Sequence, residues 1–183
     1  MQGEEIIYKS FDSTQTVEEA MHFPVEFLNS VNIAGIPPHK LTLKIGCPVM
    51  VLRSLELDPP NITNGTWCRV RACHANVIEV IILHGPASGK VAFIPRIPLI
   101  PSTADIPFQF KRLQFPLRLC FAMTIIKAQG QTFSAIGLDL TTAIFSHGML
   151  YVALSRVGKP SGIIIYTNGD TTKNIVYKNV IHV

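Results

Sequence analysis

The most constraining feature of this sequence is a change of pattern part-way along the chain. Across residues 41–100 no helical period occurs, and short apolar or alternating runs are separated by turn residues. After residue 100 the order becomes strand, polar loop, strand, helix and strand, which is typical of α/β folds. The pattern predicts an α/β chain that carries a β-rich, barrel-like insert.

The insert and the residues before it are divided by turn signals. Residues 1–20 are polar and mixed, which predicts an extended or loosely ordered lead-in, and Pro24 favours the start of a short helix. A turn is expected at Asn64-Gly65. Strands are expected at residues 41–45, 48–53, 67–73, 77–83 and 90–97. A connector is indicated by the prolines Pro95, Pro98, Pro101 and Pro107.

The segment after the connector combines strands with one helix. Buried strands are predicted at residues 115–126 and 162–166, with a shorter strand at residues 136–140. A helix is predicted to end at Gly158 and Pro160. One face of that helix is formed by Leu150, Ala153, Leu154 and Val157.

Composition excludes several classes of protein. Apolar residues make up 48% and charged residues 15% of the chain, so intrinsic disorder is excluded for most of it. The apolar runs are too short to span a bilayer, and the acidic start shows no signal or transit peptide, so an intracellular protein without a membrane partner is expected. The net charge of +4 permits a polyanionic partner without requiring one.

The cysteines do not predict a metal site. None of the four forms a Cys-x-x-Cys pair, and the nearest grouping is Cys68 with Cys73 and His74. Residues 67–73 are predicted as a strand, which would place Cys68 and Cys73 on opposite faces. We therefore expect reduced cysteines in an intracellular core.

A glycine-rich segment imitates a phosphate-binding loop. Gly85-Pro-Ala-Ser-Gly-Lys90 has three residues between its glycines, and Val91 follows the lysine where the phosphate loop has Ser or Thr. The segment also joins two predicted strands, so we interpret it as a hairpin turn. No other Gly-Lys-Ser or Gly-Lys-Thr occurs, so this chain lacks the phosphate loop of an ATPase.

Two polar segments near the carboxyl end carry candidate chemistry. Residues 121–133 bring Thr, Lys, Gln and Gly to the end of a predicted strand, where α/β sheets bind ligands. Arg156 ends an otherwise apolar helix, and its planar cation is suited either to snorkelling or to contacting a phosphate. Each segment alone would be weak support for a function.

Together the two segments are specific. Residues 124–132 (Thr-Ile-Ile-Lys-Ala-Gln-Gly-Gln-Thr) and 150–157 (Leu-Tyr-Val-Ala-Leu-Ser-Arg-Val) resemble motifs V and VI of superfamily-one DNA helicases. The nearest similarity is to the Pif family, including the helicase arm of Helitron transposons. Residues 35–41 (Gly-Ile-Pro-Pro-His-Lys-Leu) and 43–53 also look like that family in order and spacing, so the resemblance covers nearly the whole chain.

The resemblance implies a fold and a domain plan. The chain would be the second of two RecA-like lobes, with a small all-β Src-homology-like barrel inserted. Residues 1–40 would be the lead-in and start of that lobe, 41–100 the barrel, and 101–183 the remainder with motifs V and VI. ATP lies between the lobes in this family, and the missing N-terminal RecA-like lobe would carry the phosphate loop and the Mg²⁺ carboxylate.

Nucleotide-side roles are carried over position by position. The resemblance makes Arg156 the catalytic arginine finger that reaches the γ-phosphate. Gln129 and Gly130, together with Arg156, would face the nucleotide. Tyr151 and Ser155 would position the finger. The resemblance implies no metal ligand in this chain, so ATP and Mg²⁺ would be bound mainly by the missing lobe and no cofactor by this chain alone.

The same resemblance assigns a track for single-stranded DNA, with some departures from the family. Thr124, Lys127 and Thr132 would lie near the DNA backbone, where contacts do not depend on base sequence. Ile126 stands where the family usually has Asn or His, and Met149 replaces a usual Gln. These changes remove polar groups, so they weaken the expected coupling to DNA.

The implied activity is that of the C-terminal part of an ATP-dependent 5′-to-3′ DNA helicase, inactive by itself. Two alternatives remain open: a solitary lobe that binds single-stranded DNA, and a decayed transposon remnant without activity. The resemblance connects the chain with DNA repair, recombination and telomere maintenance, and it implies the nucleus, or a mitochondrion, as the compartment.

Overall fold

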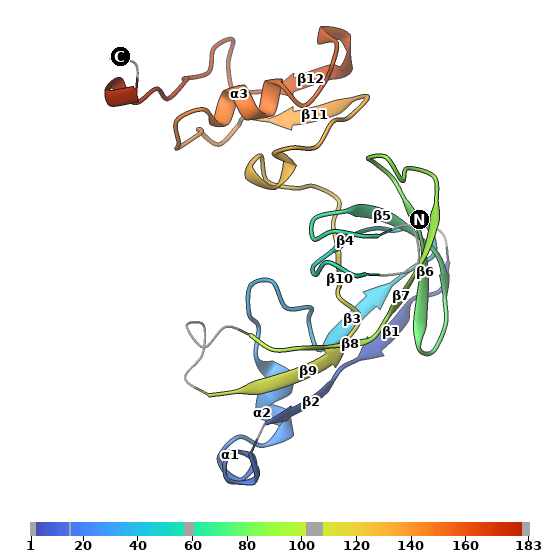
Figure 1. Ribbon diagram of the computed structural model, residues 1–183. Coiled ribbons are helices and arrows are strands. Elements are labelled where there is room, and N and C mark those ends of the chain that lie inside the picture. Colours follow the sequence, from blue (N-terminus) through green and yellow to red (C-terminus); the bar gives the residue numbers. More distant parts are fainter. Residues whose placement is uncertain (1–2, 15, 57–60, 102–107, 181–183) are drawn as a thin grey trace. The chain divides into compact units, whose positions relative to one another are not determined.

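The computed structural model describes residues 3–14, 16–56, 61–101 and 108–180. The chain divides into two compact units, Met1–Phe121 and Ala122–Val183, which are described separately below (Figure 1). No helix in the described ranges is long and apolar enough to cross a membrane.

The first unit is built around a five-stranded antiparallel sheet (Figure 1). Its order is β10 (Leu117–Leu119), β4 (Pro48–Val51), β5 (Trp67–Cys73), β6 (Val77–Ile82) and β7 (Val91–Pro95). Alternate residues face the core because successive side chains in a strand point to opposite faces. In β6 these inward residues are Ile78, Val80 and Ile82, all buried.

Two smaller sheets and two helices complete the first unit. One sheet pairs β1 (Ile6–Lys9) with β3 (Lys40–Leu43), and the other has the order β2 (Phe11–Thr14), β9 (Phe110–Gln114), β8 (Ile97–Leu99). The helices are α1 (Val17–His22) and α2 (Val25–Ser30). Pro24 is the N-cap of α2, which confirms the helix start that its fixed φ favours.

The turns between the central strands agree with the sequence. Asn64 and Gly65 form the turn before β5, and Gly65 has a φ of 87°, which glycine adopts without strain. The segment from Gly85 to Lys90 joins the antiparallel strands β6 and β7, and the Gly89 amide donates to the Ile82 carbonyl (2.8 Å). The imitation of a phosphate-binding loop is therefore a hairpin connection, as predicted.

The second unit is a small parallel α/β arrangement (Figure 1). Its two strands, β11 (Ile136–Asp139) and β12 (Ile163–Tyr166), are parallel and in register. It also contains α3 (Met149–Leu154) and the short 3-10 turns η1 (Ile126–Ala128), η2 (Pro160–Gly162) and η3 (Lys178–Val180). Its buried core consists of Leu138, Leu140, Ile144 and Ala153.

The polar lead-in forms strands and the start of a helix. Residues 1–20 are predicted to be an extended or loosely ordered lead-in, and the structure favours the extended alternative, because they contain β1, β2 and part of α1. Two side chains of this segment, Ser10 and Asp12, are polar and nevertheless buried. Composition alone therefore does not reveal these strands.

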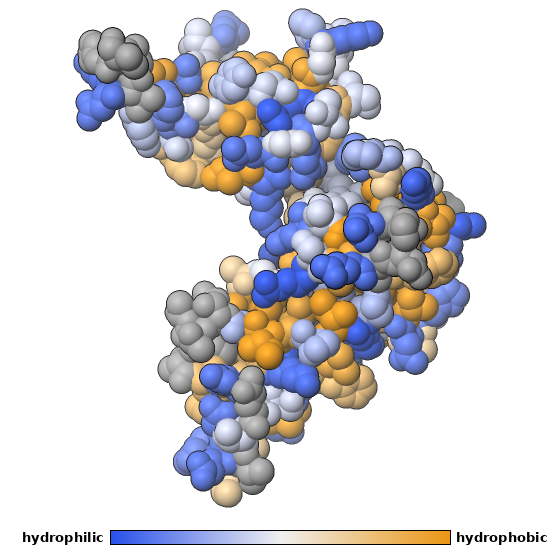
Figure 2. Space-filling model, viewed as in Figure 1, coloured by the Kyte–Doolittle hydropathy of each residue, from blue (hydrophilic) through white to orange (hydrophobic). Residues whose placement is uncertain are grey.

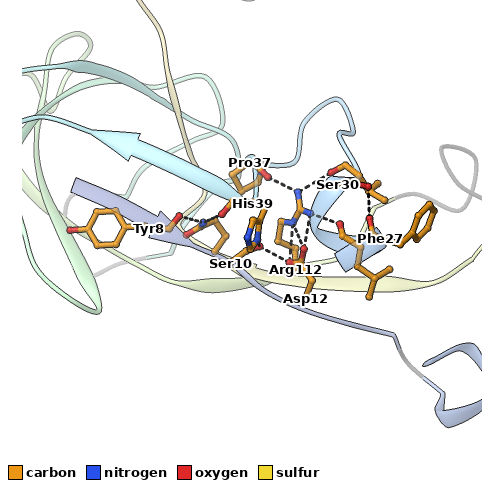
Figure 3. Close-up of polar contacts among 11 residues, drawn as sticks. Tyr8, Ser10, Asp12, Phe27, Ser30, Pro37, His39 and Arg112 are labelled. Carbon is orange, nitrogen blue, oxygen red and sulfur yellow. Dashed lines mark hydrogen bonds and ion pairs between the residues drawn. The ribbon is translucent and has the colours of Figure 1, made fainter. Parts of the chain in front are cut away.

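Asp12 of β2 is buried in a polar network around Arg112 of β9 (Figure 3). Arg112 is 1% exposed, and its Nη2 donates to Asp12 Oδ2 at 2.7 Å and to the Leu28 carbonyl at 2.9 Å. Its Nη1 donates to the carbonyls of Val31 (3.2 Å) and Pro37 (3.0 Å). One guanidinium thus fixes α2 and the following loop to the sheet, with its charge balanced by Asp12.

A second layer of hydrogen bonds extends the network to His39. Ser10 Oγ donates to Asp12 Oδ1 (2.7 Å) and lies 2.8 Å from His39 Nδ1. Because the single hydroxyl proton of Ser10 goes to Asp12, His39 Nδ1 must be the donor in the second contact. Burial lowers the pKa of His39, and the nearby Asp12 opposes that shift.

The cysteine prediction was wrong in one respect. The register of β5 against β6 shifts between Val70 and Ala72, so Cys68 pairs with Ile82 and Cys73 with Ile78. An extra residue at this β-bulge resets the alternation, and Cys73 packs against the same core as Cys68. All four cysteines are free thiols, and burial raises the pKa of Cys68 to about 12.

The predicted buried strand at residues 115–126 is mostly absent. Only β10 is strand, and Phe121 and Ile126 are exposed. The ladder stops because the partner strand β4 begins at Pro48, whose carbonyl accepts the Cys120 amide (3.1 Å) but which has no N–H to return.

The proline connector is also partly strand. Pro95 ends β7, and Pro98 lies within β8. Both are edge strands of their sheets, where a missing N–H is tolerated. The structure does not describe residues 102–107, so the prediction for Pro107 lies outside the described residues.

In the second unit the predicted strands at residues 136–140 and 162–166 and the predicted helix are present, but the helix is shorter and the burial differs. The helix α3 ends at Leu154 rather than at Gly158, and Val157 forms a bridge to Phe133 instead of extending the helix face. The strand at residues 162–166 is observed as β12, yet Ile164 is 77% exposed, and Leu154 of the predicted apolar helix face is also exposed. In Figure 2 apolar side chains of this unit reach the surface beside hydrophilic ones. The apolar residues of β12 therefore form a face that the described residues leave exposed.

Candidate functional site

The candidate site is the loop that precedes β11, residues 124–132, together with the end of α3. The loop contains η1, whose turn is closed by the Ala128 amide donating to the Thr124 carbonyl (3.2 Å). Gly130 follows with a φ of 78°, a left-handed conformation that side chains disfavour. A glycine is needed here so that the backbone can reverse between Gln129 and Gln131.

Gln131 ties the reversed loop together. Its amide donates to the Ala128 carbonyl (3.1 Å), and its side-chain Nε2 donates to the Lys127 carbonyl (3.1 Å). These two bonds close the loop across Gly130. As a result the carbonyl groups of Ala128 and Gln131 face the end of α3, where both accept hydrogen bonds from Arg156.

Arg156, the predicted arginine finger, is hydrogen-bonded to this loop. Its Nη1 donates to the Gln131 carbonyl (3.0 Å) and more weakly to the Ala128 carbonyl (3.5 Å). Its Nε donates to the Val152 carbonyl (2.7 Å). The Arg156 main-chain carbonyl also accepts the Phe133 amide (2.9 Å), so side chain and backbone both join α3 to the loop.

Ser155 contacts the guanidinium directly, whereas Tyr151 does not. Ser155 Oγ accepts a bond from Arg156 Nη2 (2.7 Å) and donates to the Val152 carbonyl (3.1 Å). Tyr151 contributes its carbonyl to the Ser155 amide (2.9 Å), while its side chain is 75% exposed. The structure thus brings Ser155 and Arg156 together and leaves the Tyr151 ring in solvent.

The remaining predicted residues lie on the outer surface of the loop. Thr124, Lys127, Gln129 and Thr132 are exposed, as is Gly130. Because these side chains are exposed, they do not line a buried pocket. An exposed loop with hydroxyl, amide and ammonium groups can contact the phosphates of a nucleic acid.

Ile126 interrupts this polar surface. Its side chain is 58% exposed among the polar residues of the loop. An exposed Ile offers no hydrogen bond to a phosphate or base. Ile126, where the resemblance predicts Asn or His, therefore lies on the same exposed loop as Lys127 and is apolar.

The carboxyl ends of the parallel strands carry a second polar group. Asp139 ends β11, and its Oδ1 accepts bonds from both the hydroxyl (2.7 Å) and the amide (2.9 Å) of Thr141. These bonds lower the pKa of Asp139. Across the described residues no group of three or more His, Cys, Asp or Glu is placed to hold a metal ion.

The sequence interpretation missed the acceptors of Arg156. These acceptors are the backbone carbonyls of Ala128 and Gln131, which residue types do not reveal, and Gln131 is predicted only as a member of a motif. The spacing of the two motifs could not show that their residues are hydrogen-bonded. It also missed Arg112, although the alternation of Phe110, Arg112 and Gln114 in β9 was available as a signal.

Comparison with known proteins identifies the relatives of this arrangement. The family described as DNA helicase Pif1, 2B domain, matches residues 26–71. The ATP-dependent DNA helicase Pif1 of Bdellovibrio bacteriovorus is 31% identical over 157 residues, covering 83% of this chain and 33% of the relative. The helicase PIF6 of Trypanosoma brucei brucei is 31% identical over 120 residues, covering 64% of this chain and 15% of the relative.

A solved structure agrees with the sequence relatives. The crystal structure of Pif1 helicase from Bacteroides in complex with ADP-AlF3 and single-stranded DNA has a TM-score of 0.62 and 27% identity, covering 96% of this chain and 38% of that chain. The chain spans a third or less of the length of the two curated relatives named above. It belongs to the Pif1 family of DNA helicases and corresponds to part of such a protein.

Proposed function

We propose that this chain is the C-terminal part of an ATP-dependent 5′-to-3′ DNA helicase. It supplies the arginine finger, Arg156, and part of the track for single-stranded DNA, at Thr124, Lys127 and Thr132. ATP and Mg²⁺ are bound mainly by the N-terminal lobe of the complete protein. The chain alone has no phosphate-binding loop, so it turns over no ATP.

The two units fit this proposal. We assign the five-stranded sheet of the first unit to the small Src-homology-like barrel, because its alternating strands enclose one apolar core. We assign the second unit to the RecA-like lobe, because β11 and β12 are parallel and a polar loop leads into them. The Bacteroides relative was crystallised with single-stranded DNA and a nucleotide analogue, which is the pair of ligands proposed here.

The observation that carries the proposal is the contact between Arg156 and the loop at residues 128–131. Gln131 and Arg156 lie 25 residues apart in the chain. Each of their segments is weak as a motif by itself, and one guanidinium joins the two. A planar cation next to a loop in which Gln129 and Gly130 are exposed supports a site for a charged phosphate. Ser155 holds the Nη2 end of the fork, in keeping with the positioning role expected of it.

The test is Arg156→Ala in a complete helicase that contains this segment. ATP turnover should fall by roughly 10³–10⁵-fold, because a finger acts on the charge of the transition state, while nucleotide binding stays within a few-fold. Arg53→Ala is the matched control, since Arg53 is exposed and lies in the first unit. Turnover that survives Arg156→Ala would remove the finger assignment.

A solitary DNA-binding lobe remains the second candidate, and the exposed loop favours testing it. The isolated chain should bind labelled oligo(dT) weakly, with an affinity that falls as salt rises, because phosphate contacts release counterions. It should show no ATPase activity with or without that DNA. The affinity should drop for Lys127→Ala and hold for Arg53→Ala. A remnant without function would bind no oligo(dT) under these conditions.

Assignment to the Helitron branch, to repair or telomere maintenance, and to the nucleus or mitochondrion rests on the sequence resemblance. Expression of the complete protein with a fluorescent tag, followed by localisation, tests the compartment directly.

A further inference from the structure

The guanidinium of Arg156 is largely consumed by bonds within its own unit. Nε is bonded to the Val152 carbonyl, Nη1 to the carbonyls of Gln131 and Ala128, and Nη2 to Ser155 Oγ. These contacts use all but one of the N–H groups that an arginine can donate. A phosphate approaching the fork therefore meets groups that already have acceptors.

The acceptors lie on both sides of the loop reversal. Ala128 precedes Gln129 and Gly130, and Gln131 follows them, so the same nitrogen fastens both ends of the exposed turn. The Ala128 carbonyl also accepts the Gln131 amide (3.1 Å), so that amide lies directly beside the guanidinium contact. A charged donor bound to a backbone carbonyl contributes more than a neutral one.

We propose that Arg156 is a positioning residue for the loop at residues 127–132, and that it exchanges the Ala128 and Gln131 carbonyls for a phosphate when nucleotide is engaged. The inference rests on the proposed function for its nucleotide half and on the hydrogen bonds of Arg156 to the loop for its loop half. In the loop-bound state Arg156 holds Lys127 and Thr132 in one arrangement. In the phosphate-bound state the loop loses that support.

The exchange couples two ligands through one side chain. If the held loop binds single-stranded DNA better, nucleotide engagement weakens DNA binding, and DNA weakens nucleotide engagement by the same factor. The coupling needs no movement of the units relative to each other, because every group involved lies in the second unit. The main-chain bond from the Phe133 amide to the Arg156 carbonyl persists in both states, so the loop stays attached.

The experiment is residue-resolved amide hydrogen exchange on this chain, comparing wild type with Arg156→Gln and Arg156→Lys. In Arg156→Gln the Gln131 amide should exchange on the order of tenfold faster, because the bond from the charged donor is lost. Arg156→Lys keeps the charge but not the fork and should give an intermediate rate. Arg53→Gln removes an exposed arginine of the first unit and should change nothing at Gln131.

An internal reference separates a loosened loop from an unfolded unit. The Leu140 amide donates to the Tyr166 carbonyl (2.8 Å) in the same unit but outside the loop, and its exchange should not change. Exchange at Gln131 that is equal in Arg156→Gln and wild type would overturn the inference. So would equal acceleration at Gln131 and Leu140, because the arginine would then support the whole unit rather than the loop.

Oligo(dT) binding in the same samples distinguishes the inference from the proposed function. Arg156→Gln should bind severalfold more weakly than Arg53→Gln, although each loses one positive charge. Equal weakening in the two variants would overturn the coupling to DNA. If wild type binds no oligo(dT) while the difference at Gln131 persists, the proposed DNA track fails and the loop-holding role of Arg156 stands.

Discussion

The two units of this chain differ in how completely they bury what they contain. The first has one large cluster of buried apolar residues, although Phe11 and Phe93 stay exposed, and it satisfies a buried Arg112–Asp12 pair with carbonyl and hydroxyl partners. The second has a smaller core and leaves Ile164 and Tyr166 of β12 exposed. Parallel strands are normally covered on both faces, so the second unit presents surfaces that larger parallel sheets bury.

The difference separates stability from function. The candidate site lies in the unit with the smaller core, on an exposed loop held by a few hydrogen bonds. Loops of low local stability are where ligand-linked movement is found, whereas well-packed units resist it. We therefore expect changes in the first unit to alter the free energy of unfolding and changes in the second to alter ligand binding.

The largest effect on stability is expected from Arg112→Met. Removing one partner of a buried ion pair leaves the Asp12 charge unpaired, so the first unit should lose about 3–5 kcal/mol of unfolding free energy. The only tryptophan, Trp67, lies in this unit, so its fluorescence during denaturant unfolding reports the loss. Exchange of the Leu140 amide in the second unit should stay unchanged.

The double variant Asp12→Leu with Arg112→Met divides that loss into parts. It should recover some of the unfolding free energy, because no carboxylate is left unpaired. It should not recover all of it, because the carbonyls of Leu28, Val31 and Pro37 still lack the guanidinium. Full recovery would show that these carbonyl bonds contribute nothing to stability.

A matched pair of isoleucines compares the two units directly. Ile78→Ala in β6 should cost about 2–5 kcal/mol, because the side chain is fully buried and a cavity remains. Ile164→Ala in β12 should cost no more than about 0.5 kcal/mol, because its side chain is already in solvent. Denaturant unfolding of both variants measures the contrast, and equal losses would contradict the burial described here.

A smaller effect is expected at high pH through Tyr8. Burial, with a contribution from Cys73, raises the pKa of Tyr8 from 10.0 to about 12. The neutral phenol is favoured in the folded state, so this stability is present below pH 10 and is lost as pH rises towards 12. Between about pH 9 and about pH 11.5 the loss should be about 2 kcal/mol.

Tyr8→Phe provides the measurement for that pH dependence. The variant should lack this part of the alkaline loss, although it also loses the bond from the Tyr8 hydroxyl to the His74 carbonyl (3.0 Å). Tyr166→Phe is the control, since Tyr166 is exposed on β12. A Tyr8→Phe variant with the same slope of unfolding free energy against pH as wild type would remove Tyr8 as the cause.

The smallest effect is expected at Ile126 of the candidate site. Ile126→Asn restores a polar side chain on an exposed position beside Lys127, so oligo(dT) affinity should rise by about two- to tenfold, the range of one hydrogen bond. Unfolding free energies should stay the same, because the side chain makes no core contact. Ile126→Leu controls for altered shape, and tighter binding by that variant would argue against a polar contact.

The strands of the first unit could be predicted because their inward residues are apolar and alternate. Ile78, Val80 and Ile82 show this pattern in β6. The same alternation in β9 contains Arg112 and Gln114. The burial of Arg112 depends on Asp12, which lies 100 residues away in the chain. A polar residue shows no burial signal until that distant partner is known.

The register of β5 illustrates a second limit. The predicted strand at residues 67–73 has the same bounds as β5. The bulge between Val70 and Ala72 nevertheless moves Cys73 to the face of Cys68. A bulge is set by pairing with the neighbouring strand, which the sequence of one strand does not contain. In the candidate site the resemblance selects the residues of both motifs, whose roles stay predictions, whereas no sequence signal selects the carbonyl acceptors of Arg156.

The prolines of the edge strands have a consequence for the behaviour of the protein in concentrated solution. Pro98 lies at the centre of β8 and Pro95 at the end of β7, and each edge therefore lacks an N–H at that residue. A strand from a second molecule would find gaps in the ladder at these two edges. The sheets of an apolar chain are thereby protected from growing into fibrils by strand addition at these positions.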